Sequence, residues 1–493
     1  MLTTNAFPRS HVCWHVYGLL HRSDRNYNEA IKAYKQALRI DPENLQILRD
    51  LSLLQVQMRD LSGFLLTRHT LLSLKPNAKM NWLSFALAKH LNKDHEGAIK
   101  VIDIYLGTLT EGSPELERGF ESSELAMYRN SILAEIPNNF QSALEHLDEC
   151  EKVVVDRGAW LLARARYQLQ LKQYDEAKRT FLSLFERGAS DEYRIHSGYM
   201  CALLELDPQI CDEAIRVTGM DTVATTRSLT AEQRKKLLEH YQGEMRSRMP
   251  RSQTVQRIPL TLIDDDQFRE SIDTYCRKRL SKGVPSLGTD VCSLLVESEN
   301  GVFRRVDDPV DVKNHPRYRL FVEMADGYVE SLDSTSKFAS TDEKEEPPST
   351  LLWTWYFRAV LHEQAGELTE GIVLMDKCLE HTPSAVDVYE LKARLLKAAG
   401  DIRGAVECLD KGRDLDKQDR YINNQTTKYM LQADMEDTAL ERIALFTKHE
   451  GNPEQNLFDM QCSWYELELA DCLARKQAWG RSLKKFGKLL RSE

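Results

Sequence analysis

The sequence predicts an all-α fold in which antiparallel helix pairs stack into a solenoid, or superhelix. Two observations carry this prediction. Large and small residues recur with a period of 34 residues, and no segment alternates polar and apolar residues for long enough to form a convincing sheet. The composition allows a core, since 42% of the 493 residues are hydrophobic and 29% are charged. General disorder is therefore excluded.

The first repeat shows the pattern most completely. Trp14 and Gly18 belong to its first helix, Ala30 and Tyr34 to its second, and Pro42 closes the second helix. Two antiparallel helices approach closely only where small residues sit at their crossing, while large aromatic residues fill the flanking space. This distribution is typical of a tetratricopeptide (TPR) repeat.

The same spacing continues along the chain. Steps of 34 residues lead to Leu48 and Trp82, then the phase resets and Ala143 and Ala177 share a new one; Trp355 and Tyr389 share a third. At least seven TPR-like units follow from this count. The predicted divisions are a leader at 1–9, a first TPR array at 10–110, TPR-like helical pairs at 111–245, an irregular helical connector at 246–350, and a second TPR array at 351–493.

The connector loses the regular spacing. The segment 297–318 is polar and contains Gly301, Pro309 and Pro316, and the segment 331–350 is rich in Ser, Thr, Asp and Glu and ends near Pro347-Pro348. Such composition favours surface loops. The sequence therefore predicts loops at both segments within a chain that is otherwise helical.

Charge and cysteine usage narrow the class of protein. With 66 Lys and Arg against 76 Asp and Glu, the net charge of -10 excludes a general nucleic-acid coat, so no DNA partner is expected. No apolar run is long enough for a membrane span, and the start lacks the pattern of a secretory signal. The ten scattered cysteines are typical of reduced thiols, which favours a cytoplasmic protein without membrane association.

Signatures of catalysis and of metal binding were sought and not found. The sequence has no GxxxxGK phosphate loop, GxSxG elbow, HExxH motif, CxxC pair or histidine pair at ligand spacing. We interpret His95 and His196 as helix-surface residues. The predictions are no catalytic residue, no metal site and no cofactor held by the chain itself, which together indicate a non-enzymatic scaffold.

The concave side of the first array is the candidate partner groove. Seven of the twelve positions expected to line it are apolar. The candidate residues are Leu19, Leu53, Val56, Met80, Leu83 and Leu87. Large apolar surfaces are disfavoured on free monomers, so the groove indicates a lasting protein partner. The alternative is that tight winding packs these side chains against one another.

Two basic segments carry further hypotheses. The stretch 475–493 reads as a basic amphipathic helix that either touches RNA or an anionic surface or, as the favoured interpretation, forms half of a TPR unit. The stretch 411–428 lies at a repeat junction, where converging cations could hold a polyphosphate. A solvated basic face is the simpler interpretation of the second stretch.

Several motifs outside the TPR positions resemble one known family. They are Ser10-His11-Val12-Cys13-Trp14-His15-Val16, Asn44-Leu45-Gln46-Ile47-Leu48-Arg49-Asp50-Leu51, Arg257-Ile258-Pro259-Leu260, Lys282-Gly283-Val284-Pro285-Ser286-Leu287, Pro347-Pro348-Ser349-Thr350-Leu351-Leu352-Trp353 and Asp419-Arg420-Tyr421-Ile422-Asn423. The chain is similar in these stretches to the auxiliary subunit of the N-terminal acetyltransferase A (NatA) complex. Both ends depart from the family pattern, so we expect a shortened member.

The resemblance implies a non-catalytic scaffold. Such a subunit wraps a GNAT-fold catalytic subunit, which alone binds acetyl-coenzyme A, and anchors it at the ribosome for co-translational N-terminal acetylation. The resemblance further implies an inositol hexakisphosphate as structural glue in some members, with Arg420, Lys428 and Lys448 as the residues similar to that site.

Two other functions were weighed. A co-chaperone-like TPR adaptor clamps a C-terminal carboxylate with Lys, Asn and Arg, but the corresponding positions here include His15, Asp50 and Ser84. Asp50 would repel that ligand. An enzyme in its own right is the second alternative, and purified chain turning over acetyl-coenzyme A without a partner would support it.

Overall fold

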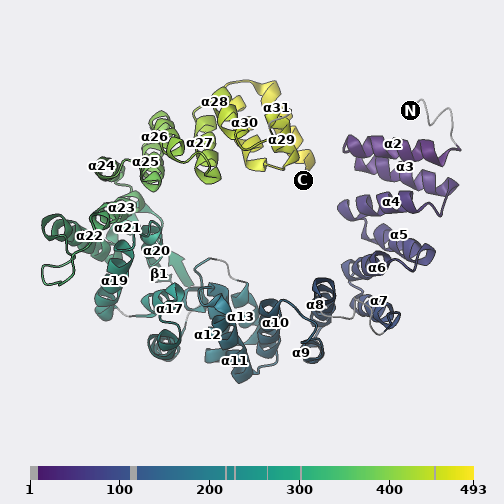
Figure 1. Cartoon of the computed structure of the whole chain (residues 1–493), viewed down its shortest axis with the longest axis horizontal. Coiled ribbons are helices and arrows are strands. Elements are labelled where there is room, and N and C mark those ends of the chain that lie inside the picture. Colours follow the sequence, from purple (N-terminus) through teal and green to yellow (C-terminus); the bar gives the residue numbers. More distant parts are fainter. Residues whose placement is uncertain are drawn as a thin grey trace. The chain divides into compact units, whose positions relative to one another are not determined.

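A computed structural model describes residues 9–110, 119–216, 219–226, 229–263, 265–299, 302–448 and 451–492. The predicted leader at 1–9 therefore lies outside these residues except for Arg9. The chain divides into two compact units, Met1–Val223 and Ala224–Glu493, and each is considered by itself. Both consist chiefly of antiparallel helices, which confirms the predicted all-α TPR class (Figure 1).

The first unit is a succession of helix pairs, seen in purple and blue in Figure 1. Each helix packs against the next one along the chain. The helices are α2 (His11–Ser23), α3 (Tyr27–Ile40), α4 (Leu45–Gln57), α5 (Leu61–Leu74), α6 (Lys79–Leu91), α7 (His95–Gly107), α8 (Phe120–Glu135), α9 (Phe140–Glu149), α10 (Arg157–Gln170), α11 (Tyr174–Leu184), the π-helix η1 (Phe185–Ala189), α12 (Tyr193–Leu204) and α13 (Pro208–Ile215). The short helix α14 (Val223–Thr226) lies at the division between the units.

The second unit begins with short helices and ends with regular pairs. Its elements are α15 (Ala231–His240), the π-helix η2 (Tyr241–Met245), α16 (Arg246–Arg248), α17 (Gln253–Arg257), α18 (Pro259–Leu262), α19 (Asp265–Leu280), α20 (Leu287–Cys292), β1 (Val296–Glu299), β2 (Val302–Arg305), α21 (Pro309–Asn314) and α22 (Pro316–Thr335), followed by α23 (Pro348–Gln364), α24 (Leu368–His381), α25 (Val386–Ala398), α26 (Ile402–Leu415), α27 (Arg420–Gln432), α28 (Glu436–Ala444), α29 (Pro453–Asp459), α30 (Ser463–Arg475) and α31 (Trp479–Ser492).

The first helix pair packs as its sequence predicts. Ala30 and Tyr34 of α3 are fully buried, with Trp14 packed against their cluster. A methyl group added to Gly18 of α2 would lie 2.3 Å from Cε1 of Tyr34, so only glycine allows this approach. The small residue at the crossing and the aromatic beside it are therefore one packing unit.

The turn inside most pairs uses a residue in the left-handed region. These residues are Arg25, Arg59, Lys93, Asn138, Lys172, Gly366, Gly400, Asp434 and Gln477. The second helix of three pairs then starts with the sequence Asp-x-x-Gly, in which the aspartate accepts a hydrogen bond from the glycine N–H: Asp60 from Gly63 at 3.0 Å, Asp94 from Gly97 at 2.9 Å and Asp401 from Gly404 at 2.8 Å. A carboxylate at an N-cap satisfies a free N–H and complements the helix dipole.

The connector differs from its prediction in two places. The segment 297–318, expected as a loop, contains the antiparallel hairpin β1–β2, the helix α21 and the start of α22. Four-residue strands are too short to show a period of two, and prolines at 309 and 316 begin helices here, since a first-turn proline gives up no hydrogen bond. In the segment 331–350, α22 continues to Thr335 and α23 begins at Pro348, which leaves a shorter non-helical stretch than expected.

A buried ion pair holds the connector together. Arg257 Nε donates to Asp290 Oδ1 at 2.6 Å, and its Nη2 donates to the Ser293 hydroxyl at 2.7 Å. The Tyr275 hydroxyl donates to the other oxygen of Asp290. Burial, reinforced by the charge of Asp290, raises the pKa of Tyr275 and keeps it protonated. These groups anchor α17, α19 and α20 to one another.

Candidate functional site

The first helices of the first three pairs, α2, α4 and α6, present an apolar stripe to solvent. Leu19, Leu53 and Leu87 are 34 residues apart and are exposed by 39%, 49% and 40%. Val12 and Met80, which share another repeat position, are exposed by 56% and 67%. We call these five residues the apolar stripe. Identical repeat positions place them on equivalent faces of successive helices, so the stripe is continuous across the array.

The other two candidate groove residues are less accessible. Val56 and Leu83 are half-buried, and Leu83 packs against the core cluster formed by α6, α7 and α8. The mutual packing weighed as an alternative thus applies to part of the groove. The four other candidates, Leu19, Leu53, Met80 and Leu87, remain open to a partner.

A carboxylate with three polar neighbours lies beside the stripe. His15 Nε2 lies 2.9 Å from Asp50 Oδ2, Arg22 Nη1 donates to Oδ1 at 3.3 Å, and Gln46 donates to Oδ2 at 3.2 Å. This arrangement puts a negative group where a carboxylate clamp needs cations. The geometry therefore speaks against the co-chaperone-like alternative.

The three candidate polyphosphate residues do not form one cluster of free cations. Arg420 begins α27 and lies over the Phe446 ring at 5.4 Å, and the exposed Lys448 follows that ring by two residues. Lys428 lies two helical turns further along α27, and its Nζ is 3.3 Å from Glu468. Arg420 and Lys448 are accordingly the better placed pair for an anion.

Most charge at this repeat junction is neutralised within the fold. The buried Arg413 lies 2.6 Å from Asp410 and 2.6 Å from Asp414, and Arg442 also pairs with Asp410 at 3.0 Å. Burial opposes ionisation of Asp410, but hydrogen bonds and charges from both arginines outweigh it and lower its pKa. The predicted basic stretch thus offers fewer free cations than its sequence suggests.

The basic amphipathic stretch forms the second half of a helix pair, the interpretation favoured above. The helix α31 packs against α30, and Lys485 pairs with Glu454 at 2.9 Å and with Glu466 at 3.0 Å. Trp479, Leu483 and Leu490 remain exposed on it.

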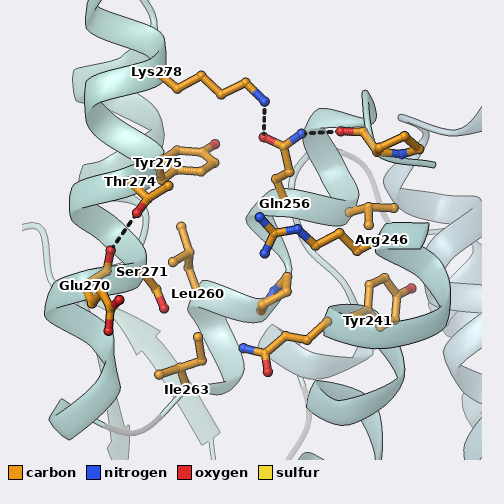
Figure 2. A pocket seen from close by; sticks show the side chains of 14 residues that line it. Tyr241, Arg246, Gln256, Leu260, Ile263, Glu270, Ser271, Thr274, Tyr275 and Lys278 are labelled. Atoms are coloured by element: carbon orange, nitrogen blue, oxygen red, sulfur yellow. Dashed lines mark hydrogen bonds between the residues drawn. The ribbon is translucent and has the colours of Figure 1, made fainter. Parts of the chain in front are cut away.

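A pocket of about 410 Å³ lies within the second unit, between α19 and the η2 to α18 segment. Figure 2 shows Lys278 pointing toward Gln256, which accepts a hydrogen bond from its ammonium at 3.3 Å. Burial, with the nearby charges of Lys282, Arg279 and Arg246, lowers the pKa of Lys278. The 14 lining residues include no His, Cys or Asp, so they hold no nucleophile–base pair of the usual kinds. The pocket can bind a small group but has no evident catalytic apparatus.

One expected surface residue is buried. His196 of α12 is fully enclosed, with its ring 4.5 Å from that of Phe185 and its Nε2 2.9 Å from the Ser190 carbonyl oxygen. The prediction was wrong because α12 is covered on several sides, and its whole length from Ile195 to Leu204 is buried. Burial lowers the pKa of His196 to about 4, which keeps the ring neutral.

Comparison with known proteins decides the family. The family described as "N-terminal acetyltransferase A, auxiliary subunit" matches residues 120–492, and a tetratricopeptide repeat matches residues 11–44. The chain belongs to the NatA auxiliary-subunit family. The resemblance seen in the sequence is thereby confirmed.

Individual members of the NatA auxiliary-subunit family agree. The chain is 40% identical over 483 residues to the N-terminal acetyltransferase A complex auxiliary subunit NAA15 of Arabidopsis thaliana, which covers 97% of this chain and 49% of that protein. It is 34% identical over 478 residues to N-alpha-acetyltransferase 16, NatA auxiliary subunit, of Homo sapiens, covering 97% and 50%. The chain therefore spans about half the length of these relatives.

A solved structure, Naa15/Naa10 bound to HypK-THB, has a chain that superposes with a TM-score of 0.77 at 29% identity, over 99% of this chain and 66% of that one. The relatives are named as auxiliary subunits, which agrees with the predicted non-catalytic class. In the described part of the chain, no helix is both long and apolar enough to cross a membrane.

Proposed function

We propose that this chain is a scaffold of a NatA-type complex, in which a GNAT-fold subunit carries out co-translational N-terminal acetylation in the cytoplasm. The family match over residues 120–492 carries the proposal. The similarity to a chain of a Naa15/Naa10 complex supports a two-subunit assembly. The apolar stripe supplies a surface that a stable partner would cover.

The direct test is co-expression of the 493-residue chain with a GNAT-fold NatA catalytic subunit, followed by pull-down and acetylation of a Ser-starting peptide. We expect a stable complex with higher Ser-peptide activity than the catalytic subunit alone. A folded chain that neither binds that subunit nor changes its activity would overturn the proposal. Ribosome anchoring is part of it and is tested by co-sedimentation of the complex with ribosomes.

The apolar stripe offers a sharper test. Leu53→Asp combined with Met80→Asp places two charges on the stripe, and both side chains are exposed enough for the fold to tolerate the change. We expect at least ten-fold weaker binding of the catalytic subunit. The control is Leu66→Asp, which charges a 70% exposed leucine on α5, a second helix of its pair. Equal binding by both variants would place the partner elsewhere.

The polyphosphate belongs to the proposal as a ligand of the second unit. Arg420 and Lys448 would contact inositol hexakisphosphate directly, with Lys428 contributing once its pair with Glu468 opens. Arg420→Glu with Lys448→Glu should abolish saturable binding in calorimetry, whereas Lys377→Glu on the exposed face of α24 should not. Unchanged affinity in the double variant would remove this site.

A further inference from the structure

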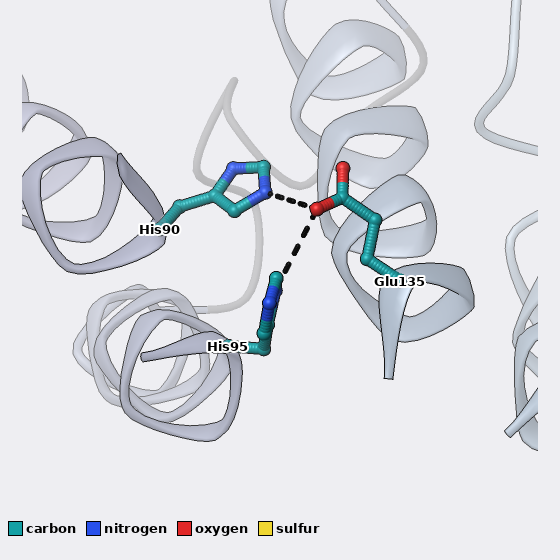
Figure 3. A group of neighbouring side chains, drawn as sticks. All are labelled: His90, His95 and Glu135. Atoms are coloured by element: carbon teal, nitrogen blue, oxygen red, sulfur yellow. Dashed lines mark hydrogen bonds and ion pairs between the residues drawn. The ribbon is translucent and has the colours of Figure 1, made fainter. Parts of the chain in front are cut away.

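Three side chains that can bind a metal converge in the first unit. His90 comes from α6, His95 is the first residue of α7 and Glu135 is the last residue of α8. Figure 3 shows both imidazoles directed at the same carboxylate oxygen of Glu135. His90 Nε2 is 3.1 Å from Oε2, and His95 Nδ1 is 3.7 Å from it. All three donor atoms lie within 4.8 Å of one another.

These separations are close to those of a zinc site. Zinc bonds of about 2.0 Å to nitrogen and oxygen, arranged as a tetrahedron, hold neighbouring donor atoms about 3.3 Å apart. Two of the three separations are already within a few tenths of an ångström of this value. A small rotation of the His95 ring, whose side chain is 19% exposed, would complete the geometry.

The polar groups here lack a sufficient partner set without a cation. His95 Nδ1 is shielded from solvent and has no hydrogen-bond partner, since 3.7 Å to Glu135 is too long for a hydrogen bond. Leaving such an atom unpaired costs free energy that a metal bond would recover. Asp94 does not supply this partner, because its carboxylate caps α7 and pairs with Lys89 at 2.6 Å.

The remaining nitrogen of His90 is held by a neighbour. Its Nδ1 lies 3.0 Å from the hydroxyl of Tyr128, also on α8. If this nitrogen carries the proton and donates to the hydroxyl oxygen, Nε2 keeps its lone pair toward Glu135. Metal-binding histidines are commonly oriented in this way by a hydrogen bond on the other nitrogen.

We propose that His90, His95 and Glu135 bind a zinc ion that links the α6–α7 pair to α8. The fourth position of the tetrahedron is left for water or an additional ligand. The metal joins helices on either side of the segment between α7 and α8. Its function is structural, and it does not depend on the catalytic partner.

The prediction of no metal site missed this group for a definite reason. A spacing of five residues does not place two histidines on one helical face, and it therefore did not register as ligand spacing. The turn at Lys93 folds α7 back onto α6 and brings the two rings to 5.5 Å between centroids. Glu135 follows 40 residues later, beyond the reach of any local pattern.

The test uses the whole purified chain, stripped of metal and titrated with zinc alone in calorimetry. We expect one saturable site per chain and a rise in the melting temperature of the chain. His95→Asn and Glu135→Gln should each weaken zinc at least ten-fold and remove the melting shift. His69→Asn, which changes an exposed histidine of the same unit, should behave as the unaltered chain does.

Cobalt supplies a second measurement that is independent of stability. Co²⁺ in this site should give the visible absorption of a four-coordinate ion without a thiolate charge-transfer band, and zinc should displace it. Zinc binding that survives both His95→Asn and Glu135→Gln, or a cobalt spectrum with a thiolate band, would assign the metal to the cysteines and overturn the proposal. Absence of saturable binding would also overturn it.

Discussion

The first three helix pairs and the connector between α17 and α23 bury their apolar side chains in different ways. In the pairs, each core cluster joins neighbouring helices, and the apolar stripe stays open to solvent. The connector instead gathers residues from Leu260 to Ala365 into one cluster, with the Arg257–Asp290 pair beside it. Repetition therefore leaves surface for a partner, whereas the irregular region uses its apolar residues internally.

The largest expected effect breaks the connector. Asp290→Ala would leave Arg257 charged, buried and unpaired, and would also remove the acceptor of the Tyr275 hydroxyl. We expect a loss of about 3–5 kcal/mol in the connector, measured as lost hydrogen-exchange protection in α17, α19 and α20. Glu323→Ala removes the partner of Arg269 in an exposed pair and should change protection little. Similar losses in both variants would contradict the distinction.

The next effect concerns acid stability of the first unit. Because burial lowers the pKa of His196 to about 4, the unfolded chain, with a histidine pKa near 6.5, binds more protons between these values. Stability present above pH 6.5 is thus lost as the pH falls toward 4, by up to about 3 kcal/mol. Hydrogen exchange of α12 at pH 7, 6 and 5, corrected for intrinsic rates, measures it.

His146 should add to this loss, since burial also lowers its pKa to about 4. His196→Gln should flatten the pH dependence in α12, whereas His381→Gln, at an exposed position of the second unit, should leave it unchanged. A slope that persists in the His196 variant would locate the sensitivity elsewhere.

A smaller effect tests the close approach inside the first pair. Gly18→Ala puts a methyl group 2.3 Å from the Tyr34 ring, and the buried ring must move. Overpacking of this kind costs about 1–3 kcal/mol. Gly107→Ala, at the end of α7 with no heavy atom within 4 Å of the new methyl, should be neutral or slightly stabilising. Thermal unfolding of the two variants compares them.

The smallest effect should be similar wherever the pairs are regular. Asp94→Ala and Asp401→Ala each remove an N-cap from the second helix of a pair, at a cost of about 1 kcal/mol. Local hydrogen exchange in α7 and α26 is the measurement. Asn is the matched replacement, since its side-chain oxygen can still accept the glycine N–H.

The accuracy of the sequence predictions follows the same division. The period of 34 residues located Gly18, Ala30 and Tyr34 correctly because each makes its decisive contact within one helix pair. The connector resisted prediction because its contacts join distant segments, as Arg257 and Asp290 do. The hairpin had a usable signal in the Asn-Gly dipeptide at 300–301, which is typical of such turns.

The candidate site was predicted in part. Four of the six groove residues are exposed as expected, since repeat position fixes the face of the helix. The basic residues were harder, because sequence cannot show that Lys428 is occupied by Glu468 or that Arg413 is buried between aspartates. Whether these surfaces bind the expected ligands stays a prediction.

The apolar stripe has a consequence for how much of this protein a cell can keep. Leucines exposed by 39–49% on successive helices are a surface that chaperones and proteases recognise as incomplete folding. We expect chain made in excess of its partner to be degraded faster than assembled chain. The supply of the smaller subunit would then set the abundance of the larger one.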